Sequence, residues 1–253
     1  MLSVFCSPAR YVQGRDATAS LGEQIAHLGL SGPALIVASA SVTAMLKDHW
    51  QAGLTPHGID FTVHQFGGEC SQLEIDSGIE AARNAGSALV IGAGGGKALD
   101  TARAISSELG LPIVNCPTLA SSDAPCSALS VAYTPDGVFE RLIFYPRNPD
   151  LVLVDTSVVA QAPRRFLVSG MGDALATWYE ARTVIEARSP NQLGGATTMA
   201  AQALAKLCCE TLYADGLDAA TAVDANAVTP ALDRIVEANT LLSGLGFESG
   251  GLA

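Results

Sequence analysis

The fold is decided by one stretch in the first half of the chain, Gly92-Ala93-Gly94-Gly95-Gly96-Lys97-Ala98-Leu99-Asp100. It follows the apolar run 88–91, which is typical of a buried strand. Three consecutive glycines leave the turn without Cβ atoms, so main-chain N–H groups can approach an anion closely. The dipole of the helix predicted over about 97–107 favours the same anion. The stretch therefore predicts a strand–turn–helix unit that holds a phosphate or pyrophosphate.

Two well-known phosphate-binding patterns do not match this stretch. A Walker loop has Gly six residues before its Lys and Ser or Thr directly after it, whereas this chain has Ile91 and Ala98. The Rossmann fingerprint requires a third Gly where this chain has Lys97. A tight turn without any ligand remains an alternative interpretation, but three glycines followed by a lysine favour phosphate.

Bulk composition limits the class of protein. The 253 residues are 49% hydrophobic and only 15% charged, which indicates a globular protein of one or two domains with extensive buried surface. A formal net charge of −11 argues against nucleic acid and anionic membranes as partners. The six cysteines form no C-x-x-C pair, and no secretory signal or membrane span is recognised. We therefore expect a cytoplasmic protein without membrane or nucleic-acid partners.

The order of strand and helix patterns predicts an α/β fold. Strands are expected at 34–38, 59–66, 88–91, 112–116 and 151–155, helices at 41–51, 71–85 and 97–107, and a hairpin at 130–133 and 140–145. After Pro163 the sequence becomes rich in Ala and Leu, as in 197–214 and 229–243. We predict a Rossmann-like parallel-sheet domain over 1–160, followed by an all-α domain over 161–253.

Two aspartates are candidate site residues on local grounds. Asp123 lies in a hydroxyl-rich loop between Pro117 and Pro125, beyond a predicted strand end where ligands bind in parallel sheets. Asp173 follows the glycine-rich bend 170–172 and is expected to begin a helix. Spacing alone favours a turn or cap role for Asp123 and an N-cap role for Asp173. Substrate binding by Asp123 and metal binding by Asp173 remain the alternatives.

Several segments together resemble a known enzyme family. The glycine stretch with Asp100 and the segments 118–133, 145–150 and 169–181 are similar to the glycerol-oxidising branch of the iron-containing (group III) alcohol dehydrogenases. That family is related in fold to dehydroquinate synthase. The similarity extends to 10–14 and 235–240 and so covers essentially the whole chain. It implies NAD-dependent oxidation of glycerol or a similar small diol to the ketone, in a cleft between the two domains of a homo-oligomer.

The resemblance also assigns roles to individual residues. Asp123 would hold a substrate hydroxyl and Asp173 would be one ligand of a catalytic zinc, which reverses both local interpretations. A divalent cation of this kind stabilises the alkoxide from which hydride leaves. The implied cofactor-binding residues are Gly94, Gly95, Gly96, Lys97, Thr118, Ser121, Ser127, Leu129 and Tyr133.

The sequence departs from the family pattern in its metal ligands. Family members place two zinc-binding histidines beyond a segment similar to 246–253, which is where this sequence stops. The four histidines present, His27, His49, His57 and His64, match no ligand position. We therefore expect an incomplete zinc site, an incomplete α domain, weak or absent zinc binding and strongly reduced dehydrogenase activity.

A second departure concerns the cofactor. Family members often have an acidic residue after the strand that here ends in Ala38-Ser39, where it would hold the adenosine ribose. Without that charge we expect weaker NAD binding and better tolerance of NADP.

Two other functions compete with a diol dehydrogenase. A synthase of the dehydroquinate type would need basic residues around its cleft, and the loop around Asp123 and the low Lys and Arg content argue against it. A non-catalytic nucleotide-binding remnant shares every motif that this chain retains, so turnover, and not NAD binding, distinguishes it from an enzyme.

Overall fold

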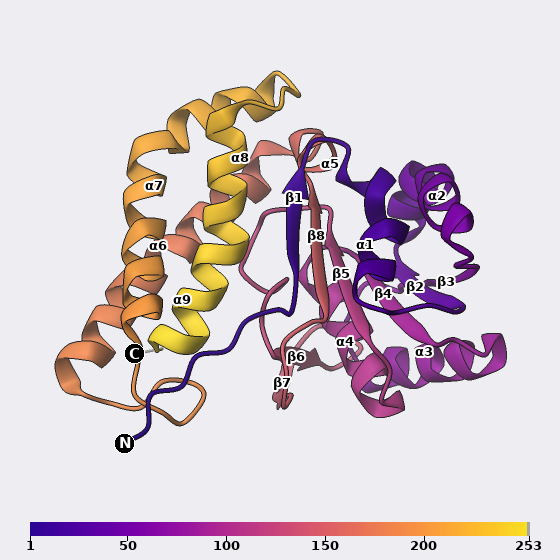
Figure 1. Cartoon of the computed structure of the whole chain (residues 1–253), viewed down its shortest axis with the longest axis horizontal. Helices are drawn as coiled ribbons and strands as arrows, with labels where there is room; N and C mark the ends of the chain where they lie inside the picture. The colour runs from indigo at the N-terminus through magenta and orange to yellow at the C-terminus, as the bar shows by residue number, and fades with distance from the viewer. Residues whose placement is uncertain (252–253) are drawn as a thin grey trace. The chain divides into compact units, whose positions relative to one another are not determined.

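The computed structural model describes residues 1–251, and the chain divides into two compact units (Figure 1). The sheet unit contains Pro8–Thr118 and Ala128–Asp155. The helical unit contains Met1–Ser7, Leu119–Ser127 and the chain from Thr156 onward. The sequence placed one boundary near residue 160. In the structure, two short segments from the first half of the chain also belong with the helices.

The sheet unit is built on a six-stranded, entirely parallel sheet with the order β1-β8-β5-β4-β2-β3. Its strands are β1 (Tyr11–Gly14), β2 (Ala34–Ala38), β3 (Phe61–Gln65), β4 (Leu89–Gly94), β5 (Ile113–Pro117) and β8 (Leu151–Asp155). The predicted parallel α/β fold is confirmed. Strand β1 was not predicted, because Tyr-Val-Gln-Gly is short and has no apolar run.

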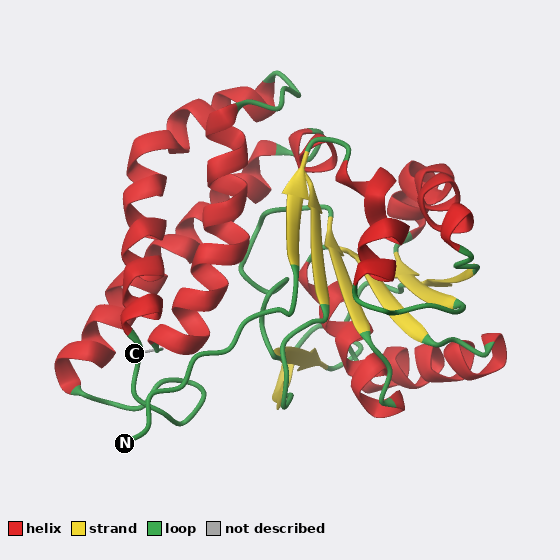
Figure 2. Cartoon of the chain, viewed as in Figure 1, coloured by secondary structure: helices red, strands yellow, loops and turns green. Residues whose placement is uncertain are grey.

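Helices cover both faces of this sheet (Figure 2). The unit contains η1 (Ala17–Ser20), α1 (Leu21–His27), α2 (Ala40–Leu54), η2 (Thr55–His57), α3 (Gln72–Ala85) and α4 (Gly96–Leu109). Right-handed crossovers that run in opposite directions along a sheet use opposite faces, so α2 lies on one face and α3 and α4 on the other. Leu35, Val37 and Val90 from the strands pack there against Ala102 and Ile105 of α4.

Strand register brings three strand ends to one edge of the sheet. Ala38 of β2 pairs with Ala93 of β4, and Gly94 of β4 pairs with Pro117 of β5. Ser39, Gly95 and Thr118 therefore follow neighbouring parallel strands at the edge where ligands bind in such sheets.

A two-stranded antiparallel hairpin completes the sheet unit, as predicted. It consists of β6 (Leu129–Tyr133) and β7 (Phe139–Phe144), and β6 packs on α4. The hairpin therefore lies next to the helix that begins at the three consecutive glycines 94–96, called the glycine turn below.

The helical unit is a bundle of α5 (Thr156–Ala160), α6 (Arg164–Ala187), α7 (Met199–Asp224), α8 (Pro230–Glu237), the π-helical turn η3 (Ala238–Leu242) and α9 (Ser243–Gly250). Small side chains, Ala174, Cys208 and Ala238, fill its centre together with Leu242. The Ala- and Leu-rich stretch 229–243 forms α8 and η3 and reaches the first residue of α9. Within residues 1–251, no helix is both long and apolar enough to cross a membrane.

Two local predictions need correction. Asp173 does not begin a helix, because α6 runs without a break through Gly170 and Gly172. The spacing of Ser71 and Glu74 also predicts a capping box at the start of α3, of which only half forms. Ser71 accepts the N–H of Glu74, but the Glu74 carboxylate is occupied by the N–H of Gly67 and by His64.

Candidate functional site

The glycine turn joins β4 to α4 through a backbone that favours glycine. Gly94 has φ +156°, and a Cβ at this position would lie 2.9 Å from the Cβ of Ala98. The carbonyl of Gly95, the N-cap residue of α4, accepts the N–H groups of Ala98 and Leu99 at 3.0 and 3.2 Å. The chain therefore turns sharply into the helix without any side chain over its first N–H groups.

This helix start differs from four others in the chain. Ser39, Ser71, Thr198 and Thr229 each cap a helix by accepting a main-chain N–H with the side-chain oxygen. Gly95 has no side chain, so the first N–H groups of α4 receive no such cap. An anion is the natural partner for N–H groups left open in this way. The turn thus fits the pyrophosphate of NAD.

Lys97 is engaged with protein groups. Its Nζ lies 2.6 Å from both carboxylate oxygens of Glu69 and 4.7 Å from the centre of the Tyr133 ring. Glu69 was not predicted, because no motif or spacing marks this residue in the loop before α3.

The predicted cofactor residues are divided between the two units. Gly94, Gly95, Gly96, Lys97, Thr118, Leu129 and Tyr133 belong to the sheet unit. Thr118 is buried, and its N–H donates to the carbonyl of Gly94 at 3.0 Å. Ser121 and the buried Ser127 belong to the helical unit.

A buried ion pair on α4 was not predicted either. Arg103 Nη1 donates to Asp100 Oδ1 at 2.8 Å and also to the carbonyl of Leu129. Val131 N–H donates to Asp100 Oδ2 at 3.1 Å, and Ser130 Oγ donates to the Asp100 carbonyl. Burial raises the pKa of Asp100, although the charge of Arg103 acts in the opposite direction. The pair fixes β6 to α4.

The helical unit brings the two candidate aspartates together. Asp123 N–H donates to Asp173 Oδ2 at 3.1 Å, and Ser243 Oγ donates to Asp123 Oδ2 at 3.0 Å. Burial raises the pKa of Asp123 to about 7, and the nearby charges of Asp173 and Glu248 act in the same direction. Loss of water also raises the pKa of Asp173. Ser243 was not predicted, because it is distant in the sequence and follows the π-helical turn.

Two features hold the Leu119–Ser127 loop in place. Asn239 in η3 donates from Nδ2 to the carbonyls of Ala120 and Leu167 at 2.9 and 3.2 Å. Gly170 allows α6 to approach the same loop, since a Cβ there would overlap the Ala120 carbonyl. Gly170, which the sequence placed in a bend, therefore lies within a continuous helix and allows the close contact of that helix with the loop.

Zinc fits the described residues poorly. Residues 1–251 contain no group of three or more His, Cys, Asp or Glu side chains that could hold a metal ion. The four histidines lie in the sheet unit, where His64 is 3.0 Å from Glu74. Asp123 and Asp173 alone do not make the three-ligand set of a catalytic zinc site. The described residues alone therefore do not form a catalytic zinc site.

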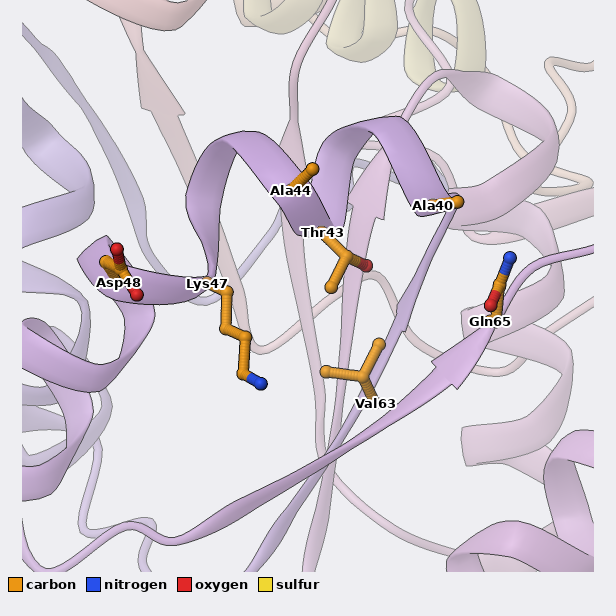
Figure 3. Close-up of a pocket in the computed structure, with 7 residues that line it drawn as sticks. All are labelled: Ala40, Thr43, Ala44, Lys47, Asp48, Val63 and Gln65. Atoms are coloured by element: carbon orange, nitrogen blue, oxygen red, sulfur yellow. The ribbon is translucent and has the colours of Figure 1, made fainter.

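A separate pocket of about 430 Å³ lies between α2 and the edge strand β3 (Figure 3). Ala40 and Gln65 mark one end and Lys47 and Asp48 the other. Its remaining lining residues are Thr43, Ala44 and Val63. None of the predicted cofactor or substrate residues lines it.

The fold and these segments place the chain in a family of alcohol-oxidising enzymes. Residues 8–156, nearly the extent of the sheet unit, match the iron-containing alcohol dehydrogenase family. The chain belongs to this family and is an enzyme of the oxidoreductase class.

Individual relatives match the chain over its full length. It is 49% identical to a glycerol dehydrogenase of Citrobacter freundii and 50% identical to a glycolaldehyde reductase of Halobacterium salinarum. Each match covers 100% of this chain and 69% of the relative. The crystal structure of a probable glycerol dehydrogenase from Sinorhizobium meliloti 1021 is similar with a TM-score of 0.92 at 42% identity, covering 100% of this chain and 69% of that one.

Proposed function

We propose that this enzyme oxidises glycerol, or a similar vicinal diol, to the corresponding hydroxyketone with NAD. The relative named as a glycerol dehydrogenase supports the substrate class. The observation that carries the proposal is the position of Asp123, whose carboxylate is held by Ser243 beside Asp173. A carboxylate of this kind accepts hydrogen bonds from substrate hydroxyls.

The chain's own residues would bind and orient both reactants. The main-chain N–H groups at Gly95, Gly96 and Lys97 would bind the pyrophosphate, with Gly94 shaping the turn. The residues proposed to line the nucleotide are Thr118, Ser121, Ser127, Leu129 and Tyr133. NAD supplies the acceptor for the hydride that leaves the alcohol carbon.

Asp123 is proposed as the substrate-binding residue. With a pKa of about 7, its carboxylate can accept a hydrogen bond from one diol hydroxyl near neutral pH and can also hold a proton there. Asp173 is the proposed metal-facing carboxylate, in line with the resemblance. The described residues do not complete a zinc site around it.

Reduction of a small hydroxyaldehyde is a second candidate reaction. The Halobacterium salinarum relative, 50% identical over the whole chain, is named a glycolaldehyde reductase. Glycolaldehyde has a hydroxyl next to a carbonyl, so the same carboxylate can accept a hydrogen bond from it.

The test measures NADH formation from glycerol and NADH consumption with glycolaldehyde, using the 253-residue chain with and without added zinc. Asp123→Asn and Asp173→Asn are compared with Asp136→Asn in the exposed hairpin turn. NAD binding is measured by calorimetry on the same samples. We expect Asp123→Asn to abolish whatever turnover the chain has, with unchanged NAD binding. NAD binding without turnover by the unmodified chain would support the non-catalytic alternative, and no binding would contradict both.

We propose in addition a cytoplasmic homo-oligomer. All six cysteines fall within residues 1–251 and are free thiols, which is typical of a reducing compartment. Met199, Leu207 and Leu217 on α7 are exposed apolar side chains that a second copy could cover.

A further inference from the structure

Three segments of the sheet unit meet at the Lys97 side chain. Glu69 comes from the loop before α3, Lys97 from the first turn of α4, and Tyr133 from the end of β6. The ammonium contacts both Glu69 oxygens at 2.6 Å and faces the Tyr133 ring at 4.7 Å. The main chain joins the same two segments, because the carbonyl of Cys70, the residue after Glu69, accepts the Tyr133 N–H at 2.8 Å.

The charge of Lys97 is paired within the protein, by the carboxylate of Glu69. The Lys97 side chain is 43% exposed and that of Glu69 29%, so water reaches the pair and its strength alone is modest. The Tyr133 ring and the main-chain hydrogen bond at Cys70 restrict the positions that this ion pair can take. With Glu69 on one side and Tyr133 on the other, the ammonium is a compensated charge and not a free cation at the turn.

The same face of α4 holds the rest of β6. Asp100 and Arg103 follow Lys97 at intervals of three residues, and both bind β6 around Leu129 and Val131. The contact of Lys97 with Tyr133 therefore extends this row of contacts from the buried Asp100–Arg103 pair to the far end of β6. The row joins the helix of the phosphate turn to the strand proposed to line the nucleotide.

We propose that the Lys97 side chain is a positioning residue, which Glu69 holds against Tyr133 to fix the end of β6, while the cofactor's pyrophosphate is bound by the main chain of the glycine turn. This inference rests on the proposed NAD binding, but its first consequence concerns the protein without cofactor. Removing either charge should loosen the end of β6, and neutralising Glu69 should not make the lysine a better phosphate ligand.

The first test is hydrogen exchange of the cofactor-free chain. Lys97→Met should speed exchange at the Tyr133 amide about fivefold, the effect expected from losing a pair worth up to about 1 kcal/mol. Lys97→Arg should restore slow exchange, because a guanidinium can pair with Glu69 and lie over the ring. Lys47→Met, which removes an exposed lysine from α2, is the matched control and should leave Tyr133 unchanged. Unchanged exchange in Lys97→Met would overturn the proposal, whether or not the chain binds NAD.

The second test is calorimetric titration with NAD at several salt concentrations. Lys97→Met and Glu69→Gln should each raise Kd about threefold to fivefold, the double variant should match the single ones, and the salt slope should stay that of the unmodified chain. Tighter binding by Glu69→Gln, or a flatter salt slope in Lys97→Met, would identify a direct phosphate ligand and contradict the proposal. Failure of the unmodified chain to bind NAD would contradict the proposed function instead, and the exchange experiment would still decide the role of Lys97.

Discussion

The glycine turn and the Asp123 carboxylate are built in opposite ways. The turn is formed by consecutive residues, and the N–H groups proposed to bind phosphate belong to the main chain of one strand–helix junction. The carboxylate site combines Asp123, Asp173 and Ser243, which come from a loop and two helices far apart in the sequence. The turn therefore depends on local backbone geometry, whereas the carboxylate depends on how the loop packs on the bundle.

Each region also needs a glycine, for a different reason. Gly94 is needed for its backbone conformation and its closeness to Ala98. Gly170 has ordinary helical geometry, and its missing Cβ leaves room for the Ala120 carbonyl. Substitutions at these two glycines therefore separate a local requirement from a tertiary one.

The largest effect expected of a single glycine substitution is a loss of stability at Gly170. Gly170→Ala places a Cβ on the Ala120 carbonyl and should lower the free energy of unfolding of the helical unit by roughly 3 kcal/mol, because helix and loop must move apart. Gly172→Ala, on the same helix with no atom within 4 Å of the added Cβ, should instead stabilise it by about 0.5–1 kcal/mol. Urea unfolding measures both variants, and equal effects would show that the loop does not constrain Gly170.

The next effect concerns the turn. Gly94→Ala should raise the Kd for NAD at least about tenfold, near 1.4 kcal/mol, because the new Cβ strains the backbone and crowds Ala98. Gly14→Ala, at the end of β1 with no neighbouring atom within 4 Å of the added Cβ, is the control and should bind normally. Calorimetry measures the Kd of both variants. Normal NAD binding by Gly94→Ala would show that the pyrophosphate does not bind at the glycine turn.

A separate effect should appear in the pH dependence of stability. Folding raises the pKa of Asp123 from 3.8 to about 7, so the folded chain binds more protons than the unfolded chain between these values. The stability of the unmodified chain should therefore fall, relative to Asp123→Asn, as pH rises from about 4 to about 7. Urea titrations with a chelator present measure the difference, and Asp136→Asn controls for the loss of a carboxylate. A difference that is constant with pH would contradict the raised pKa.

The smallest effect concerns cofactor choice. Ser39 follows β2 beside the turn and caps α2 through the N–H of Val42 at 3.3 Å, a role that aspartate also fills. Ser39→Asp should weaken NADP binding about threefold to fivefold relative to NAD, because its charge repels the 2′-phosphate. Ser39→Asn is the neutral control. An unchanged ratio of the two Kd values would indicate that the ribose lies away from β2.

Local sequence patterns were sufficient for most elements but misled at particular residues. The apolar runs predicted β2, β4, β5 and β8, and Pro135-Asp136-Gly137 predicted the hairpin, because these signals depend on neighbours in the chain. Asp173 was placed at a helix start because glycines usually weaken helices. The packing of α6 against the loop at Ala120 outweighs that tendency. Glu74 was expected to complete a capping box, but His64 and Gly67 use its carboxylate.

The sequence by itself determined the parallel α/β fold, the glycine turn between β4 and α4 and the family, because these follow from contiguous residues whose conformational preferences are local. Only the tertiary structure placed Ser243 on Asp123, Glu69 on Lys97 and Arg103 on β6. Such contacts join residues distant in the chain, and their energies depend on burial and distance, which no spacing along a single sequence specifies.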